Sequence, residues 1–145
     1  SGRGVVSWSG SLGLTDRVHF TGFIDGENYV GMLRAFDIGV FLTPGSDGTC
    51  RAAREILAMG RPMVVADRGM LAEIVTHGES GLVCDGSPEA LFQALETLAE
   101  DRVRRLEMGR AARRLADERY SLAQQARAVL AIYKEILHNH CGQPD

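Results

Sequence analysis

Two carboxylates, Asp47 and Glu55, are the residues of this sequence best placed to do chemistry. Seven residues separate them, and turn-forming Pro44 and Gly45 come just before them. Either Asp47 or Thr49 has a side chain that can cap a helix. We therefore expect a loop that leads into a helix near Thr49. Asp47 would stay in the loop, and Glu55 would lie about 9 Å along the helix axis at 1.5 Å per residue.

The start of this helix is suited to bind an anion. The first backbone N–H groups of a helix have no intrahelical acceptor, and they form the positive end of the helix dipole. Arg51 lies in the expected first turn, where a cation is unfavourable unless an anion such as a phosphate is bound. Asp47 and Glu55 would then flank a diphosphate, one towards a ribose and one towards a sugar.

Each of these residues also has a structural explanation. Glu55 can pair with Arg51 one turn earlier, which stabilises an exposed helix by only about 0.2–0.5 kcal/mol. Asp47 can be an ordinary turn or capping acid. In the next loop, Arg68 can reach a phosphate or pair with Glu73. Taken singly, these structural explanations would be preferred.

The sequence around the acidic pair resembles the retaining, metal-independent glycosyltransferases of family 4. The resemblance is to the C-terminal, nucleotide-sugar-binding lobe of their two-lobed GT-B fold. Besides the acidic pair it runs through L12-G-L-T-D-R-V-H-F-T-G-F23, A35-F-D-I-G-V-F-L-T-P44, A58-M-G-R-P-M-V-V-A-D-R-G-M-L-A-E-I-V75 and H77-G-E-S-G-L-V83. It implies transfer of a sugar, with retention of configuration, from a UDP- or GDP-linked donor to a glycan or lipid-linked acceptor, without a further cofactor.

The resemblance also implies roles for individual residues. Glu55 corresponds to the acid that contacts the ribose hydroxyls, and Asp47 to the acid that approaches the transferred sugar. The backbone amides that hold the diphosphate correspond to those of Gly48, Thr49 and Cys50. The predicted donor site consists of the catalytic pair Asp47 and Glu55 and of Gly45, Gly48, Thr49, Cys50, Arg51 and Arg68. No metal ligands are predicted.

Three positions depart from the family pattern. Asp47 is one methylene shorter than the usual glutamate, which could alter the choice of sugar or weaken transfer. Met70 stands where a second glycine usually follows Gly69, and Ala72 replaces a common proline. The acidic pair therefore has the spacing of the family pair, but its first residue is an aspartate instead of a glutamate.

Length and composition indicate one α/β domain. The chain has 145 residues, 45% of them hydrophobic and 24% charged, with a net charge of −3, and this length suffices for a sizeable core. No apolar stretch approaches the ~20 residues of a membrane span. No broad basic face indicates nucleic acid. We expect a cytoplasmic protein, and the resemblance adds the inner face of the membrane as a second location.

The cysteines indicate neither a disulfide framework nor a zinc site. Cys50, Cys84 and Cys141 are odd in number and show no C-x-x-C spacing. A thiol at a helix N-terminus, such as that of Cys50, can have a lowered pKa. The preferred interpretation of Cys50 is a small residue that lets backbone amides approach the phosphates.

Alternating strand and helix signals predict a Rossmann-like parallel sheet with flanking helices. The expected strands are 18–20, 38–42, 63–66 and 81–84. The expected helices are 27–35, the site helix ending at Gly60 and Pro62, a short turn at 71–75, one beginning at Pro88, 101–118, and one from Ser121 to about Leu137.

The order of these strands predicts an incomplete sheet. Doubly wound sheets place strand 1 at the centre, and the strands found here correspond to the third to sixth. We expect the C-terminal part of a longer enzyme, with 1–145 as its donor-binding domain, 1–11 poorly matched, 5–8 as a substitute strand and 139–145 as a disordered tail. A diphosphate-binding basic pair and the acceptor lobe would then lie upstream.

Two other classes of protein stay open. A sugar-nucleotide epimerase of the same architecture would use a similar cleft, although it is not expected to carry the acidic pair followed by A58-M-G-R-P62. A non-catalytic nucleotide-sugar-binding module is the second, and Asp47 in place of glutamate favours it. A reaction that depends on an acceptor would distinguish the glycosyltransferase from both.

Overall fold

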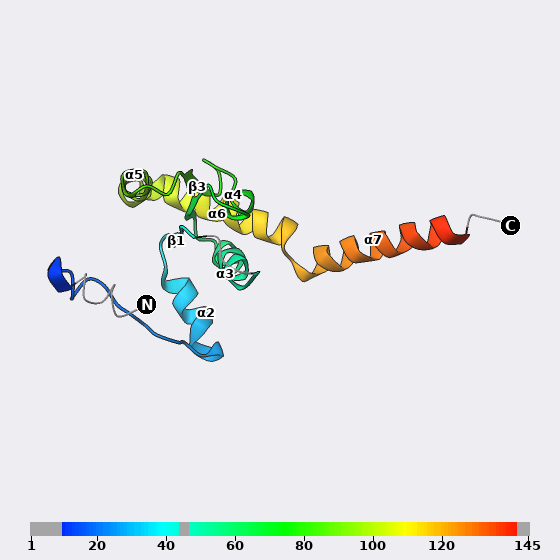
Figure 1. The fold of residues 1–145 in the computed structure, drawn as a ribbon, viewed down its shortest axis with the longest axis horizontal. Helices are drawn as coiled ribbons and strands as arrows, with labels where there is room; N and C mark the ends of the chain where they lie inside the picture. Colours follow the sequence, from blue (N-terminus) through cyan, green and yellow to red (C-terminus); the bar gives the residue numbers. More distant parts are fainter. Residues whose placement is uncertain (1–9, 44–46, 142–145) are drawn as a thin grey trace. The chain divides into compact units, whose positions relative to one another are not determined.

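The computed structural model describes residues 10–43 and 47–141. The chain divides into two compact units, Ser1–Met32 and Leu33–Asp145, and Figure 1 shows the order of the elements. The substitute strand expected at 5–8 and the predicted site residue Gly45 lie outside the described residues.

A parallel three-stranded sheet forms the centre of the second unit. Its strands are β1 (Gly39–Phe41), β2 (Met63–Ala66) and β3 (Gly81–Cys84), in the order β1-β2-β3. This confirms the predicted Rossmann-like sheet, and the bounds of β2 and β3 are those expected. All residues of β2 are buried, whereas Val40 in β1 is 41% exposed. The strand expected at 38–42 is present as β1, and it is partly exposed because, among the described strands, it pairs only with β2.

The strand expected at 18–20 is not formed. Residues 18–25 contain no helix or strand, and Val18 and Phe20 are 37% and 50% exposed. A strand satisfies its backbone groups by pairing, and no described strand pairs with this segment. The local pattern of the sequence favours a strand, but the required neighbour is not among the described residues.

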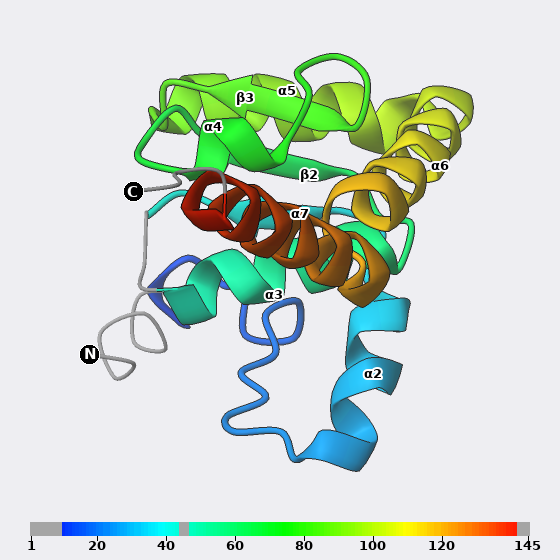
Figure 2. The ribbon, with the colours of Figure 1, turned by 90° about the vertical axis from the view of Figure 1, so that its right-hand side faces the viewer.

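Helices lie on both faces of the sheet (Figure 2), and those in contact with its strands are α3 (Asp47–Ala58), α4 (Leu71–Ile74), α5 (Pro88–Glu100) and α6 (Arg102–Arg119). The other helices are α2 (Gly26–Ala35) and α7 (Leu122–Cys141). Each expected helix is present. α7 continues beyond the predicted end at Leu137, so residues 139–141 are helical rather than part of a disordered tail, and 142–145 lie outside the described residues.

Alternation of side chains along the strands separates the two faces. A Cβ placed on Gly39 would lie 3.0 Å from Ile56 Cγ2 of α3 and 3.1 Å from Met63 Cγ, so Met63 and α3 share one face. The other face of the sheet is covered by α5 and part of α6. Val64 and Leu82 of the strands pack there against Leu98 of α5 and Met108 of α6 and form a core cluster. Ala53, Ile56 and Leu57 of α3 are all buried, so they form the apolar face with which this helix packs in the core.

Arginine side chains satisfy carbonyl groups at the ends of three helices. Arg61 Nη2 donates to the Arg34 carbonyl oxygen of α2 over 2.6 Å, and Arg105 Nη1 to that of Leu98 in α5, also over 2.6 Å. Arg113 donates to the Ala58 carbonyl oxygen of α3. Cations at helix C-termini also complement the helix dipole. Arg105 and Arg113 therefore hold neighbouring elements together.

Ser87 begins α5 and is suited to a stability measurement. Its Oγ accepts from the Ala90 N–H over 3.2 Å, with Pro88 as the first helical residue. Ser87→Ala is expected to lower the free energy of unfolding by about 1 kcal/mol, because a first-turn N–H loses its acceptor. Ser87→Asn, which restores an acceptor, serves as the control. Urea denaturation would contradict this role of Ser87 if both variants lost the same stability.

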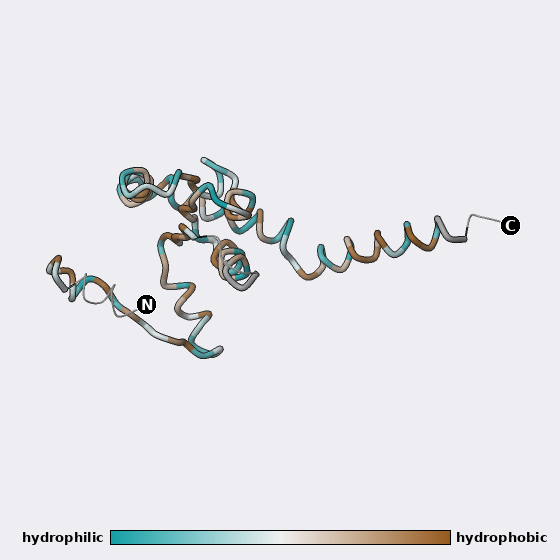
Figure 3. The backbone as a smooth tube through the Cα atoms, in the orientation of Figure 1, coloured by the Kyte–Doolittle hydropathy of each residue, from teal (hydrophilic) through white to brown (hydrophobic). Residues whose placement is uncertain are grey.

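The last helix exposes much of its apolar surface. Apolar positions recur along α7 (Figure 3), and Leu130, Ile132 and Leu137 are 57%, 57% and 63% exposed. No helix in the described part of the chain is long and apolar enough to cross a membrane.

Candidate functional site

The residues of the predicted donor site belong to segments that follow the strands. The chain leaves β1 and enters α3, the loop containing Arg68 follows β2, and Asp85 and Gly86 follow β3. Because the strands are parallel, their carboxyl ends meet at one edge of the sheet, where ligands of open α/β sheets bind. The fold therefore brings the beginning of α3 and Arg68 to the same edge.

The site helix begins earlier than predicted. α3 starts at Asp47 rather than near Thr49, so Asp47 belongs to the helix and not to the preceding loop. Either residue can cap a helix, and the sequence does not distinguish them. Asp47 and Glu55 thus share one helix, about 12 Å apart along its axis and roughly 80° apart around it. Gly48 and Thr49 lie in the first turn, where backbone N–H groups lack intrahelical acceptors.

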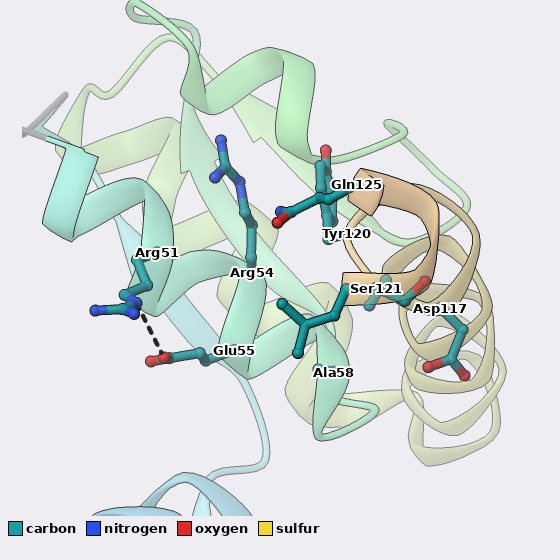
Figure 4. Close-up of a pocket in the computed structure, with 10 residues that line it drawn as sticks. Arg51, Arg54, Glu55, Ala58, Asp117, Tyr120, Ser121 and Gln125 are labelled. Carbon is teal, nitrogen blue, oxygen red and sulfur yellow. Dashed lines mark ion pairs between the residues drawn. The ribbon is translucent and has the colours of Figure 1, made fainter. Parts of the chain in front are cut away.

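Arg51 and Glu55 form the ion pair that the sequence left open as an alternative. Arg51 Nε lies 3.7 Å from Glu55 Oε1, and the two side chains are 80% and 37% exposed (Figure 4). Arg51 is now the fifth residue of α3, so its expected place in the first turn is wrong. An exposed pair of this kind contributes little to stability, and it leaves both side chains accessible to a ligand.

An open pocket of about 370 Å³ lies beside this ion pair (Figure 4). It is lined by one face of α3, the end of α6 and the beginning of α7, and includes Arg51, Glu55 and Gln125. The guanidinium of Arg54 lies 5.2 Å from the centre of the Tyr120 ring, within cation–π range. Tyr120 and Gln125 could not be found from the sequence, because no local pattern connects the end of α6 or the start of α7 with α3.

Cys50 lies within α3 and is only 4% exposed. Its sulfur is packed in the core, and the thiol is free. A ligand would therefore not reach the thiol, and the approach of phosphates to the backbone amide of Cys50 stays a prediction.

Arg68 lies against the backbone that follows β3. A Cβ placed on Gly86 would be 3.5 Å from Arg68 Nη2, so the guanidinium covers this glycine. Within the described residues, Arg68 forms no ion pair with Glu73, and that alternative is therefore wrong.

Asp85 is a further carboxylate at this edge of the sheet, and it is not among the predicted site residues. A hydrogen bond from the Ser87 backbone N–H, together with the Ser87 side chain and the positive charge of Arg68, holds the pKa of Asp85 below its ordinary value. The signal in the sequence is Asp85-Gly86-Ser87-Pro88, in which an aspartate begins a turn before a helix.

His77 has a structural role. Its Nδ1 accepts from the Val83 N–H over 3.0 Å and so ties the turn before β3 to that strand. No group of three or more His, Cys, Asp or Glu residues that could hold a metal ion occurs in the ranges 10–43 and 47–141.

Solved structures with the same arrangement of elements define the class of fold. Sucrose-phosphate synthase from Thermosynechococcus elongatus matches 94% of this chain and 34% of its own, at 22% identity and a TM-score of 0.79. Anabaena HepE in complex with UDP matches 89% of this chain and 36% of its own, at 25% identity and a TM-score of 0.75. The chain has the fold of the C-terminal domain of a GT-B glycosyltransferase.

A family model for glycosyl transferases group 1 matches residues 4–115, and the chain belongs to this family. The D-inositol 3-phosphate glycosyltransferase of Corynebacterium glutamicum is 33% identical over 129 residues, which are 88% of this chain and 30% of that protein. A GDP-mannose-dependent alpha-(1-6)-phosphatidylinositol dimannoside mannosyltransferase of Mycobacterium tuberculosis is 40% identical over 104 residues, 69% of this chain and 26% of that protein. The chain thus spans less than a third of the length of these relatives.

Proposed function

We propose that this chain binds the donor in a retaining glycosyltransferase of family 4, and that the donor is a sugar linked to UDP or GDP. The observation that carries the proposal is the position of α3, whose first turn lies at the carboxyl edge of the sheet with Glu55 two turns behind it. The relatives favour both bases, because Anabaena HepE has been solved with UDP and with UDP-glucose, and the mycobacterial relative is GDP-mannose-dependent.

The proposed contacts follow the order of the donor's parts along α3. Backbone N–H groups of Gly48, Thr49 and Cys50 would bind the diphosphate at the helix N-terminus. Glu55 would accept hydrogen bonds from the ribose hydroxyls, and Asp47 would approach the transferred sugar. The axial separation of about 12 Å between the two acids leaves room for a diphosphate between them.

The positive groups of the proposed site complete its chemistry. Arg51 and Arg68 would add charge at the diphosphate, with Gly45 in the adjoining loop. Transfer breaks the bond between the anomeric carbon and the phosphate oxygen, and negative charge develops on the departing nucleoside diphosphate. The acceptor oxygen forms the new bond on the same face of the sugar, and its proton passes to the departing diphosphate. Donors fixed in advance around the developing charge supply the largest part of such catalysis.

The acceptor is proposed to be a glycan or a lipid-linked molecule. The names of the relatives include an inositol phosphate acceptor and a phosphatidylinositol dimannoside. An acceptor of the second kind would bring the enzyme to the cytoplasmic face of a membrane as a peripheral protein.

The test is to measure nucleotide release by the complete protein in which this chain occurs. Release of UDP or GDP from nucleotide-sugars, with and without glycan and glycolipid acceptors, should rise strongly when an acceptor is present. NMR of the product should show the anomeric configuration of the donor. Conversion of the sugar-nucleotide without an acceptor would instead indicate an epimerase, and binding without release would indicate a non-catalytic module.

A further inference from the structure

The loop after β3 places a carboxylate and a glycine beside Arg68. Arg68 follows β2, while Asp85 and Gly86 directly follow β3. The two loops are neighbours because β2 and β3 pair in parallel to their last residues. One further hydrogen bond, from the Asp67 N–H to the Cys84 carbonyl oxygen over 2.7 Å, holds the beginnings of the two loops together.

Gly86 provides the surface on which the guanidinium lies. A Cβ at this position would be 3.5 Å from Arg68 Nη2, 3.6 Å from Arg68 Cζ and 3.3 Å from Ala66 Cβ. The φ angle of Gly86 is +83°, a conformation that residues with a Cβ rarely adopt. Any side chain here would be strained by the backbone conformation, and its Cβ would be in tight contact with Ala66 Cβ and in van der Waals contact with the guanidinium. Gly86 therefore lets Arg68 lie close to the backbone after β3.

Asp85 is fixed to the start of α5 and keeps its negative charge. Its Oδ1 accepts from the Ser87 N–H over 2.8 Å, and Ser87 is the residue that caps α5. The hydrogen bonds from Ser87 and, to a smaller extent, the charge of Arg68 lower the pKa of Asp85, so the carboxylate is ionised at neutral pH. Among the described residues, no carboxylate lies within ion-pair distance of Arg68.

We propose that Asp85 and Gly86 are positioning residues that hold Arg68 ready to bind the diphosphate of the donor. The inference rests on the proposed function, in which Arg68 contacts phosphate. Asp85 attracts the guanidinium without occupying its N–H groups, and Gly86 leaves it room beside the sheet edge. A guanidinium ordered before the ligand arrives loses less conformational entropy on binding, and its planar fork can bind two phosphate oxygens.

Calorimetric titration of the chain with UDP, GDP, uridine and guanosine tests this positioning. The variants are Arg68→Ala, Asp85→Asn, Gly86→Ala and the double variant Arg68→Ala/Asp85→Asn. Arg68→Ala should weaken binding of the diphosphate about tenfold, since a hydrogen bond to a charged group is lost. Asp85→Asn and Gly86→Ala should weaken it about threefold or more. Affinity for the nucleoside should stay unchanged, and Asp85→Asn should add nothing once Arg68 is absent.

The outcomes separate the inference from the function on which it rests. If the unmodified chain binds neither UDP nor GDP, the proposed function fails. If binding occurs and Arg68→Ala or Asp85→Asn leaves it unchanged, only the positioning proposal is overturned. It is also overturned if Asp85→Asn lowers the affinity for the nucleoside as much as the affinity for the nucleoside diphosphate. The same conclusion follows if the double variant binds the nucleoside diphosphate more weakly than Arg68→Ala does. Glu100→Gln, which removes a carboxylate from the other end of α5, should keep full affinity. If Gly86→Ala does not fold, the affinity of Asp85→Asn for the nucleoside diphosphate tests the positioning proposal.

Discussion

Glu55→Gln is expected to lower the affinity for UDP or GDP about tenfold to a hundredfold, the largest effect of any single change in the proposed site. Hydrogen bonds to a charged group contribute about 1.5–3 kcal/mol, and an amide presents only one oxygen to the two ribose hydroxyls. The fold should tolerate the change, because the side chain is 37% exposed and its partner Arg51 is 80% exposed. Calorimetric titration measures the affinity, and a thermal melt checks the fold.

Two comparisons make the Glu55 result specific. Glu100→Gln carries the same chemical change at an exposed position of α5, and it should leave the affinity unchanged. Arg51→Ala removes the ion-pair partner of Glu55, and it should change stability by no more than about 0.5 kcal/mol. If Glu55→Gln kept the affinity of the unmodified chain for UDP or GDP, Glu55 would not belong to the donor site. Its role would then be the ion pair with Arg51.

Gly109→Ala is expected to have the largest effect on stability, a loss of about 1–3 kcal/mol or more. A Cβ at Gly109 would be forced against the Gly60 carbonyl oxygen and would lie 3.6 Å from Pro62 Cδ. This close contact lets α6 pack against the end of α3. Alanine is the better helix former by about 1 kcal/mol, so the steric cost must exceed that gain. Urea denaturation measures the difference.

Gly31→Ala is the matched control for Gly109→Ala. Gly31 also lies inside a helix, α2, but a Cβ there would have nothing within 4 Å. The same substitution should therefore leave stability unchanged or raise it by up to about 1 kcal/mol. If both glycine variants were equally stable, α6 would not approach the Gly60 backbone as closely as the structure shows.

The elements that could be predicted are those whose signals lie within a short segment. β2 and β3 are apolar runs between turn residues, and both begin and end where expected. The site helix ends as predicted, with Gly60 at a φ of +69°. Its beginning was wrong by two residues because several residues before Cys50 can cap a helix, and the sequence does not mark which of them precedes the first turn. The expected strand at 18–20 failed for a different reason, since a strand depends on a neighbour that the segment itself does not supply.

The long-range contacts of the site could not be predicted. Nothing in the spacing connects Arg54 with Tyr120 across the interface of α3 and α6. In the same way, the contact of Arg68 with Gly86 follows only from the parallel pairing of β2 and β3. Periodicity reports which face of an element is buried. It does not report which side chains meet across two loops, and there the structure adds Asp85 to the candidate site.

A thermal melt of the 145-residue chain with UDP or GDP at millimolar concentration tests the donor site most directly. A ligand that binds the folded state raises the melting temperature by mass action. We predict a higher melting temperature with one of the two nucleotides, a smaller rise with the matching nucleoside, and loss of both rises in Glu55→Gln. A cooperative melt that neither nucleotide shifts would contradict the assignment of a donor site to the beginning of α3.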